Sequence, residues 1–218
     1  LDALGQRWAI DLGRDNYNMP GYFDRKRGGQ RWTYYRNRPE GHNTLVVNPA
    51  RTAGQRVRAT ARITKLQRRE PGPWAIADLT PSYADDVNSL QRGIRLQEDG
   101  SMVVQDELSA SEPVEIWWFM HTRAEVDIGD EQRTAVLRQG GEKLKALIGS
   151  PPGATFELRP AEPLESSPDP EMQADNKGVR ELSIHVKDVA NMRLRVMLGP
   201  PNAVGEDDHM KGASLSDW

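Results

Sequence analysis

The side chains best suited to chemistry lie in the first fifty residues. Asp11, in WAIDLG, and His42, in GHNTL, supply a carboxylate and an imidazole, and zinc accepts both as ligands. Two protein ligands alone hold zinc weakly, and most Asp and His residues this far apart in a sequence are unrelated. The alternative interpretation is a hydrogen-bonded carboxylate at a strand end and a buried, hydrogen-bonded histidine.

Tyr22 is the candidate for proton transfer. It follows Pro20 and Gly21, which predict a turn and place the phenol at a loop tip where it can meet a substrate. A phenol transfers a proton only when its pKa is lowered or a partner lies close, and the sequence shows neither. Packing of the ring over the turn is the alternative.

Cations and aromatic rings crowd together in the segment that follows. Guanidinium groups bind carboxylates and sulfates through paired hydrogen bonds, and we expect aromatic faces to stack on sugar rings. We therefore predict that this segment binds an anionic substrate through Arg25, Arg31, Trp32, Tyr35 and Arg36. Proteins that bind single-stranded nucleic acid have a similar composition, and a solvated basic loop is the third interpretation.

A second series of cations follows on a predicted strand. Its members are Arg56, Arg58, Arg62, Lys65, Arg68 and Arg69. Exposed Lys and Arg side chains on an edge strand hinder its pairing with other chains. We expect this series to form such a face.

Short segments of alternating polarity must position these side chains. Residues 6–13, 31–36 and 42–48 are predicted strands around the candidate site. Residues 114–128 form the longest predicted strand, with Trp118 on its apolar face and Trp117 and Phe119 on the opposite one. The other predicted strands are residues 57–67 and 73–80, a hairpin over residues 94–108, a hairpin of residues 134–137 and 143–148, and residues 155–158, 182–186 and 192–198.

The strand pattern predicts an all-β fold. No segment shows a helical period over three turns, and ten or more short strands with regular turns indicate an antiparallel two-sheet β-sandwich of the supersandwich type. We assign residues 1–199 to this domain, with a long exposed loop at residues 158–178. Residues 200–218 are predicted to be a flexible tail.

Charge and composition narrow the class of function. Residues 1–69 contain 15 Lys and Arg against 5 Asp and Glu, whereas residues 70–218 contain 14 against 27. This asymmetry predicts a basic surface that meets an anionic partner, unless the two halves mix in three dimensions. The absence of Cys excludes disulfides, thiolate metal sites and a Cys nucleophile. No apolar run approaches the ~18 residues of a membrane helix.

Two motifs, in this order and at this separation, resemble the heparinase II/III-like family of polysaccharide lyases: RWAIDLGRDNYNMPGYF and EGHNTLVVNP. The resemblance continues more loosely through AIADLTPSY, RGIRL, VVQDEL, WWFMHTRAEV and LKALIGSPPGATF. Members of that family join an N-terminal α/α-toroid to a C-terminal antiparallel β-sandwich. They cleave acidic polysaccharides by β-elimination at a uronic acid.

The resemblance implies roles for three residues. Asp11 and His42 match two ligands of a structural zinc ion in the sandwich domain, and Tyr22 resembles a tyrosine that faces the sugar. The remaining ligand and a catalytic histidine belong to an H-x-H element that would precede Leu1, and other catalytic residues belong to the toroid. We therefore expect this chain to be inactive by itself and to hold zinc poorly when isolated.

The predicted function is the β-sandwich part of a lyase acting on uronate-containing polysaccharides such as glycosaminoglycans. It would supply zinc ligands and part of the substrate cleft. The expected partners are an acidic polysaccharide and an N-terminal toroid, without nucleic acid or membrane, and the resemblance implies a periplasmic or secreted location. A non-catalytic carbohydrate-binding β-sandwich module is the alternative, although it leaves the Asp–His pair unexplained.

Overall fold

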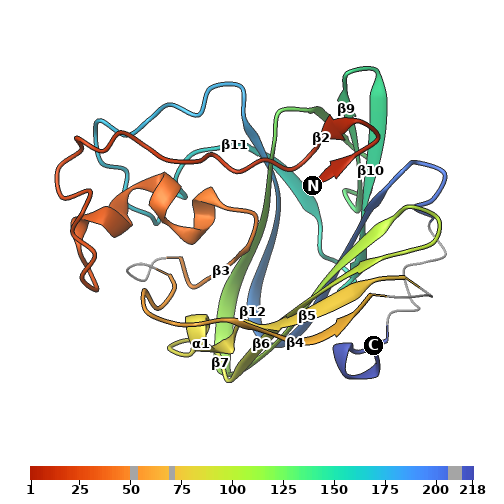
Figure 1. The fold of residues 1–218 in the computed structure, drawn as a ribbon, viewed down its shortest axis with the longest axis horizontal. Helices are drawn as coiled ribbons and strands as arrows, with labels where there is room; N and C mark the ends of the chain where they lie inside the picture. The colour runs from red at the N-terminus through yellow and green to blue at the C-terminus, as the bar shows by residue number, and fades with distance from the viewer. Residues whose placement is uncertain (50–53, 69–71, 206–212) are drawn as a thin grey trace.

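Antiparallel β-strands are the predominant regular secondary structure of the computed structural model, which describes residues 1–49, 54–68, 72–205 and 213–218 (Figure 1). The strands are β1 (Asp2–Ala3), β2 (Gln6–Arg7), β3 (Leu45–Val47), β4 (Arg62–Gln67), β5 (Trp74–Asp78), β6 (Ser89–Leu96), β7 (Met102–Thr122), β8 (Glu125–Ile128), β9 (Thr134–Gln139), β10 (Glu142–Ser150), β11 (Phe156–Pro160) and β12 (Arg180–Gly199). The helical elements are the 3₁₀ turns η1 (Gln30–Thr33), η2 (Tyr35–Asn37), η3 (Pro39–Gly41) and η5 (Leu215–Asp217), and the α-helix α1 (Thr80–Tyr83). The predicted all-β fold is confirmed.

The long strands β7 and β12 belong to both layers of the fold (Figure 1). One layer has the strand order β4-β5-β6-β7-β12-β10-β9-β8. In the other, β3 pairs with the second half of β7, and β11 pairs with the first half of β12. The register between β7 and β12 shifts on both sides of Val189, and such bulges bend strands. The core therefore lies between two layers that share the same two strands.

The predicted alternation on the longest strand is confirmed in its central part. Ile116 and Trp118 point into the main core, whereas Trp117 and Phe119 form a second cluster with Leu164 on the opposite face. The predicted boundaries are wrong, because the strand begins much earlier, at Met102, and is interrupted between the end of β7 at Thr122 and the start of β8 at Glu125. Likewise, the predicted strands at residues 182–186 and 192–198 are two parts of β12.

Two predicted strands near the candidate site do not form. Only Gln6–Arg7 of residues 6–13 belongs to a strand, although the Ile10 amide still donates to the carbonyl of His121 in β7 at 2.9 Å. Residues 31–36 lie mostly in η1 and η2, and both Tyr34 and Tyr35 are buried. Consecutive buried rings cannot both follow the alternation of a strand with one solvent face, so tertiary packing overrides the β-propensity of these aromatics.

The last six residues pack against the sheet instead of fraying. Leu215 is buried, and its amide donates to Glu107 on β7 at 3.0 Å. A Cβ at Gly93 on β6 would lie 2.3 Å from the side chain of Leu215, so only glycine permits this close approach. Residues 206–212 of the predicted tail lie outside the described residues, as does Arg69. None of the helices in the described ranges is both long and apolar enough to cross a membrane.

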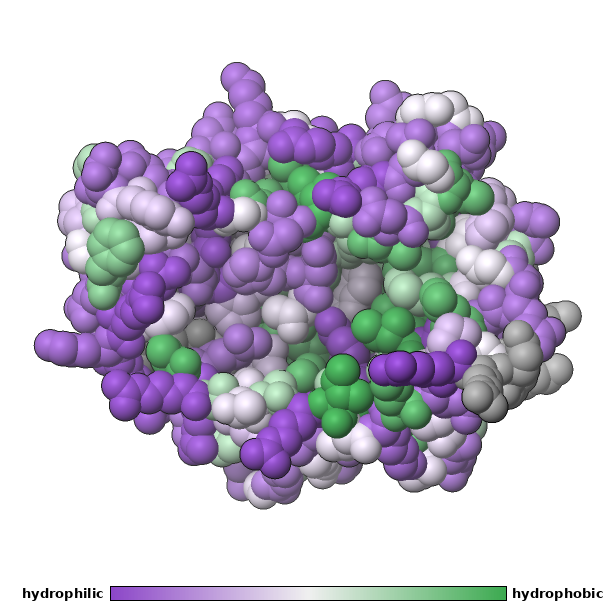
Figure 2. Space-filling model, viewed as in Figure 1, coloured by the Kyte–Doolittle hydropathy of each residue, from purple (hydrophilic) through white to green (hydrophobic). Residues whose placement is uncertain are grey.

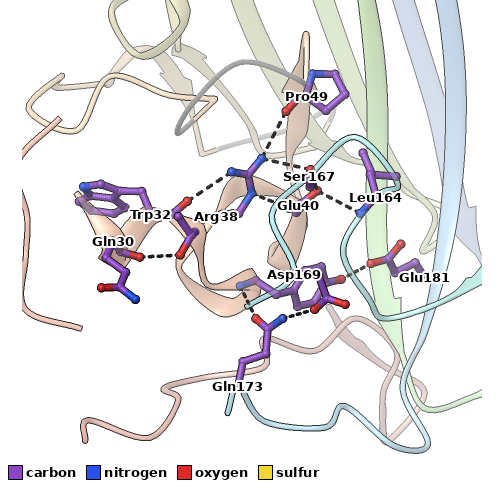
Figure 3. A network of polar contacts seen from close by, with 12 residues as sticks. Gln30, Trp32, Arg38, Glu40, Pro49, Leu164, Ser167, Asp169, Gln173 and Glu181 are labelled. Carbon is purple, nitrogen blue, oxygen red and sulfur yellow. Dashed lines mark hydrogen bonds and ion pairs between the residues drawn. The ribbon is translucent and has the colours of Figure 1, made fainter. Parts of the chain in front are cut away.

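A buried ion pair fastens the η1–η3 segment to the predicted long loop (Figure 3). Arg38 donates to Glu40 at 2.5 Å, and both side chains are almost fully excluded from solvent. The second oxygen of Glu40 accepts from the Ser167 hydroxyl at 2.8 Å, and Arg38 also donates to the carbonyls of Trp32 and Pro49. The pair is thus saturated with partners from both segments, a condition for burying two charges.

Replacing Arg38 with Met should lower the free energy of unfolding by about 3 kcal/mol, because Glu40 is left as an uncompensated buried charge. Urea denaturation measures the change. The control is Arg62→Met on the exposed β4, for which a change within about 0.5 kcal/mol is expected. A loss below about 1 kcal/mol for Arg38→Met would show that the pair does not secure this segment.

Candidate functional site

Asp11 and His42 meet in space. The Oδ2 atom of Asp11 lies 2.8 Å from Nδ1 of His42, and both side chains are partly open to solvent, at 61% and 40% of their surface. The second oxygen of Asp11 accepts the amide of Gly13 at 2.7 Å, which orients the carboxylate. The two residues singled out by type and by family resemblance therefore form one site.

The side chain of Asn43 brings them together. Its Nδ2 donates to the carbonyl of Ile10 at 2.8 Å, and its Oδ1 accepts the amide of His121 at 2.7 Å. The Ile10 amide in turn donates to the His121 carbonyl at 2.9 Å. The amide group of Asn43 thus stands between two backbones where a direct strand–strand bond would otherwise form. We call this set of three hydrogen bonds the Asn43 clamp.

The Asn43 clamp rests on a buried ion pair of the main sheet. Arg92 on β6 donates to both carboxylate oxygens of Asp106 on β7, at 2.7 and 2.9 Å, and its remaining nitrogen donates to the Asn43 carbonyl at 3.1 Å. Asp106 is buried, and its charge raises the pKa of Arg92 against the opposing effect of burial. Both the side chain and the backbone of Asn43 are therefore held.

The environment of Asp11 favours its ionised form. Partial burial raises the pKa of Asp11, but the hydrogen bonds from His42 and from the Gly13 amide outweigh it and hold the pKa below its ordinary value. A carboxylate that stays ionised at neutral pH can orient the His42 ring, accept its proton or ligate a cation.

The donor types of this pair fit zinc, but their number does not complete a zinc site. Imidazole nitrogen and carboxylate oxygen are zinc ligands, and a tetrahedral zinc keeps its ligand atoms about 3.3 Å apart. The observed 2.8 Å would have to open slightly. Within the described ranges, no group of three or more His, Asp or Glu side chains is positioned to hold a metal ion. Further ligands would have to come from outside these residues.

A buried polar triad lies beside the Asn43 clamp. The hydroxyl of Tyr35 donates to Glu181 on β12 and lies 2.8 Å from Nε2 of His121. Since the phenol has a single proton, Nε2 of His121 must be the donor in the second contact. All three side chains are almost fully buried, and Nδ1 of His121 has no hydrogen-bond partner among the described residues.

Burial governs the titration of this triad. It raises the pKa of Glu181, against the hydrogen bonds from His121 and Tyr35. Burial, followed by the negative charge of Glu181, raises the pKa of Tyr35 far beyond the range in which a phenol ionises in water. Tyr35 therefore acts here as a permanent hydroxyl donor. With only 2% of its surface exposed, its ring has no open face for stacking on a sugar in this structure. A substrate-binding role of Tyr35 stays a prediction.

Tyr22 is not the exposed loop-tip residue that the sequence predicts. Its ring is 4% exposed and packs against Tyr17 and Phe23, with the Arg31 guanidinium 4.6 Å from its centre. No hydrogen bond reaches its hydroxyl from the described part of the chain. Tyr17 and Phe23 are the exposed rings of this loop. A role of Tyr22 toward substrate stays a prediction.

The predicted anion-binding arginines separate into two kinds. Arg31 donates to the Tyr22 carbonyl at 2.9 Å, and Arg36 donates to Asn176 and to the Arg14 carbonyl, so both hold loops together. Arg25, in contrast, lines an open surface pocket. Trp32 is half-buried, and its indole donates to the Lys26 carbonyl at 2.9 Å.

Sequence reasoning missed Asn43, His121 and Glu181 as parts of the site. Asn43 follows His42 directly, but an amide in an extended segment carries no signal of its partners. Nothing in the sequence around His121 or Glu181 marks either residue as part of the site. Each acts through a contact between distant segments, which only the folded chain reveals.

Comparison with known proteins identifies a matching family and solved structures of similar fold. The family model described as "Heparinase II/III-like, C-terminal" matches residues 1–195. No curated protein sequence matches the chain significantly. Among solved structures, the chain is similar to the heparan sulfate lyase HepC from Pedobacter heparinus, with a TM-score of 0.64 and 11% identity over 90% of this chain and 29% of that one. It is also similar to a heparinase III gene product, with a TM-score of 0.57 and 16% identity over 76% of this chain and 25% of that one.

These structural similarities, at such low identity, show a shared fold. A structure titled heparinase III gives a TM-score of 0.56 at 11% identity, over 76% of this chain and 24% of that one. The chain therefore spans about a quarter of the length of the solved structures that it matches.

Replacing Asn43 with Asp should destabilise the chain by about 2 kcal/mol, because a carboxylate cannot donate to the Ile10 carbonyl and two acceptors then face each other. Urea denaturation measures the loss. Asn191→Asp, at an exposed position of β12, is the matched control and should change stability by less than about 0.5 kcal/mol. Equal effects of the two substitutions would contradict the Asn43 clamp.

Glu181→Gln should alter the pH dependence of stability. The raised pKa of Glu181 means that its contribution to stability is fully present below its ordinary value of about 4.5 and is lost as the pH rises through the higher folded-state pKa. The native chain should therefore lose stability relative to Glu181→Gln as the pH rises above about 4.5. Urea denaturation across this range tests it, with the exposed Glu157→Gln as control. A constant difference between the native chain and Glu181→Gln would refute the assignment.

Proposed function

The chain belongs to the heparinase II/III-like C-terminal family, and from that premise we propose that it is the β-sandwich part of a polysaccharide lyase. The proposed substrate is an acidic, uronate-containing polysaccharide. The proposed contribution of this chain is a metal-supported part of the substrate cleft, and the catalytic groups of the toroid complete the enzyme.

One observation carries this proposal. Asp11 and His42, 31 residues apart, converge to 2.8 Å, and the Asn43 clamp holds the two segments that carry them. A module that only adheres to carbohydrate has no need to bring an ionised carboxylate and an imidazole together on its surface. This convergence favours a lyase part over the carbohydrate-binding module.

The residues of this chain would orient and bind. Without a bound ion, Asp11 keeps the His42 ring in one orientation through the hydrogen bond to Nδ1, and the Gly13 amide orients Asp11 in turn. A zinc ion shared by the two facing atoms would take the place of that hydrogen bond. A zinc ion bound by these two side chains, with further ligands from another segment, would supply a fixed positive charge and cross-link the segments that ligate it. β-Elimination also needs the uronate carboxylate to be neutralised before the proton on C5 becomes acidic. Cations on the surface of this chain can assist that neutralisation.

The proposed partners and location follow from the same premise. The partners are an acidic polysaccharide and the toroid of the same polypeptide, without nucleic acid or membrane. The proposed location, periplasmic or extracellular, rests on the family resemblance.

In the full-length protein, His42→Ala should abolish bound zinc and reduce cleavage of a uronate polymer by about 100-fold, since the loss of a ligand removes both the ion and the orientation that it provides. Elemental analysis gives the zinc content, and the ultraviolet absorbance of the unsaturated uronate product gives the rate.

The matched control is His185→Ala. His185 is also hydrogen-bonded to a carboxylate, Glu115 at 2.7 Å, but it lies on β12 and has no part in the proposed site. It should keep both zinc and activity. A native protein that neither contains zinc nor cleaves a uronate polymer would refute the proposed function and favour the carbohydrate-binding module.

A further inference from the structure

Some Arg and Lys side chains of the first seventy residues are bonded within the protein, and others are exposed without a described partner. The guanidinium groups of Arg31, Arg36 and Arg38 donate hydrogen bonds to backbone carbonyls, to Asn176 and to Glu40. In contrast, the exposed side chains of Arg25, Lys26 and Arg58 have no hydrogen bond or ion pair with any other described residue. These three cations gather in one place.

That place is a surface pocket of about 720 Å³, which we call the basic pocket. It lies between residues 25–27, residues 54–58 and residues 82–86. Among the described residues, its lining contains five cations against two carboxylates: Arg25, Lys26, Arg27, Arg56 and Arg58 against Asp85 and Asp86. Neither Asp11 nor His42 lines it. In Figure 2, hydrophilic side chains dominate the side of the molecule on which Figure 1 places residues 14–40.

Asp85 gives the basic pocket a defined shape. One of its oxygens accepts from Arg27 at 3.0 Å, and the other accepts from two nitrogens of Arg56, at 2.6 and 3.1 Å. Arg27 and Arg56 come from segments far apart in sequence, so one carboxylate fixes the two sides of the basic pocket. Both guanidinium groups remain substantially exposed, with 80% and 48% of their side-chain surface open, and keep donors for a ligand.

The floor of the basic pocket is rigid. Tyr83 is buried, and its hydroxyl bonds to the Leu45 carbonyl at 2.6 Å and to the Gln55 side chain at 2.5 Å. The Arg56 amide donates to the Ser82 carbonyl at 2.8 Å, which ties residues 54–58 to α1. The Asn48 side chain holds Asp86 at 2.7 Å. The second carboxylate of the lining is therefore also engaged by the protein.

We propose that the basic pocket is a subsite for a sugar unit that carries sulfate or carboxylate groups. Its excess of cations, its guanidinium forks and its volume suit a small anionic ligand, since ligand pockets typically measure about 300–1,000 Å³. The proposal rests on the proposed function, which it deepens by assigning a sulfate- and carboxylate-binding role to Arg56 and Arg58. The sequence had suggested that these two only protect an edge strand.

Single-stranded nucleic acid is a poorer match to the lining. Binding of unpaired bases relies on exposed aromatic rings for stacking. Tyr83 is the aromatic residue of the described lining, and its ring is buried. Recognition of sulfate or carboxylate groups on a sugar requires no such ring.

The test is the affinity of the 218-residue chain for a heparan sulfate hexasaccharide, measured by titration calorimetry. The triple substitution Arg25→Ala, Lys26→Ala and Arg58→Ala should weaken binding about tenfold, as expected from three exposed charge contacts. The control replaces three exposed cations outside the basic pocket, Arg68, Lys143 and Lys187, and changes the net charge equally. It should weaken binding less than threefold. An unsulfated uronate hexasaccharide distinguishes sulfate from carboxylate recognition.

Asp85→Asn separates a shaped site from general electrostatic attraction. The substitution makes the chain more positive, so simple attraction predicts tighter binding. We expect binding to weaken at least threefold, because Arg27 and Arg56 lose their common anchor. Circular dichroism establishes that each variant is folded.

Four results would overturn the proposal that the basic pocket is a sugar subsite. They are no hexasaccharide binding by the native chain, equal losses of hexasaccharide affinity in the two triple variants, tighter hexasaccharide binding by Asp85→Asn, or tighter binding of a single-stranded oligonucleotide of matched charge. Each of them leaves the proposed function standing if the full-length protein still cleaves a uronate polymer with His42-dependent zinc. Absence of that cleavage would instead refute the proposed function itself.

Discussion

The site depends on one side-chain amide that takes the place of a backbone bond. Asn43 lies between Ile10 and His121, and it satisfies one carbonyl and one amide that a direct strand pair would otherwise have joined. Ile10 is thereby linked to β7 without belonging to a strand. Because Asn43 is adjacent to His42, and Ile10 to Asp11, the same contact sets the distance between the two candidate ligands.

Two buried ion pairs tie distant segments of the chain together. The pairs Arg38–Glu40 and Arg92–Asp106 are both enclosed, and each also bonds to backbone carbonyls. Removing two charges from water is tolerable only when their remaining donors and acceptors are also satisfied. The pairs consequently act as cross-links between distant segments. Cations without such partners remain available at the surface, where the basic pocket forms.

The shared strands β7 and β12 connect the buried triad of Tyr35, His121 and Glu181 to the Arg92–Asp106 ion pair. The second half of β7 carries His121, beside the clamp, while its first half pairs with β6, which carries Arg92. The bulges near Val189 turn the strands between the two layers. A single continuous strand therefore connects the buried triad to the ion pair beneath Asn43.

The sequence by itself determined the fold class, the alternating faces of the longest strand, the main hairpins and the pairing of Asp11 with His42. Alternation and turn residues are local signals, and the two motifs that contain Asp11 and His42 carry the family resemblance. Tertiary structure alone decided that Tyr35 and Tyr22 are buried, that residues 31–36 form 3₁₀ turns, and that Asn43 and Glu181 belong to the site. The physical reason is that the exposure of a ring, the partners of an amide and the pKa of a carboxyl depend on contacts formed only in the folded chain, such as that of Asn43 with His121, 78 residues away, and that of Tyr35 with Glu181, 146 residues away. No local pattern encodes the approach of such segments.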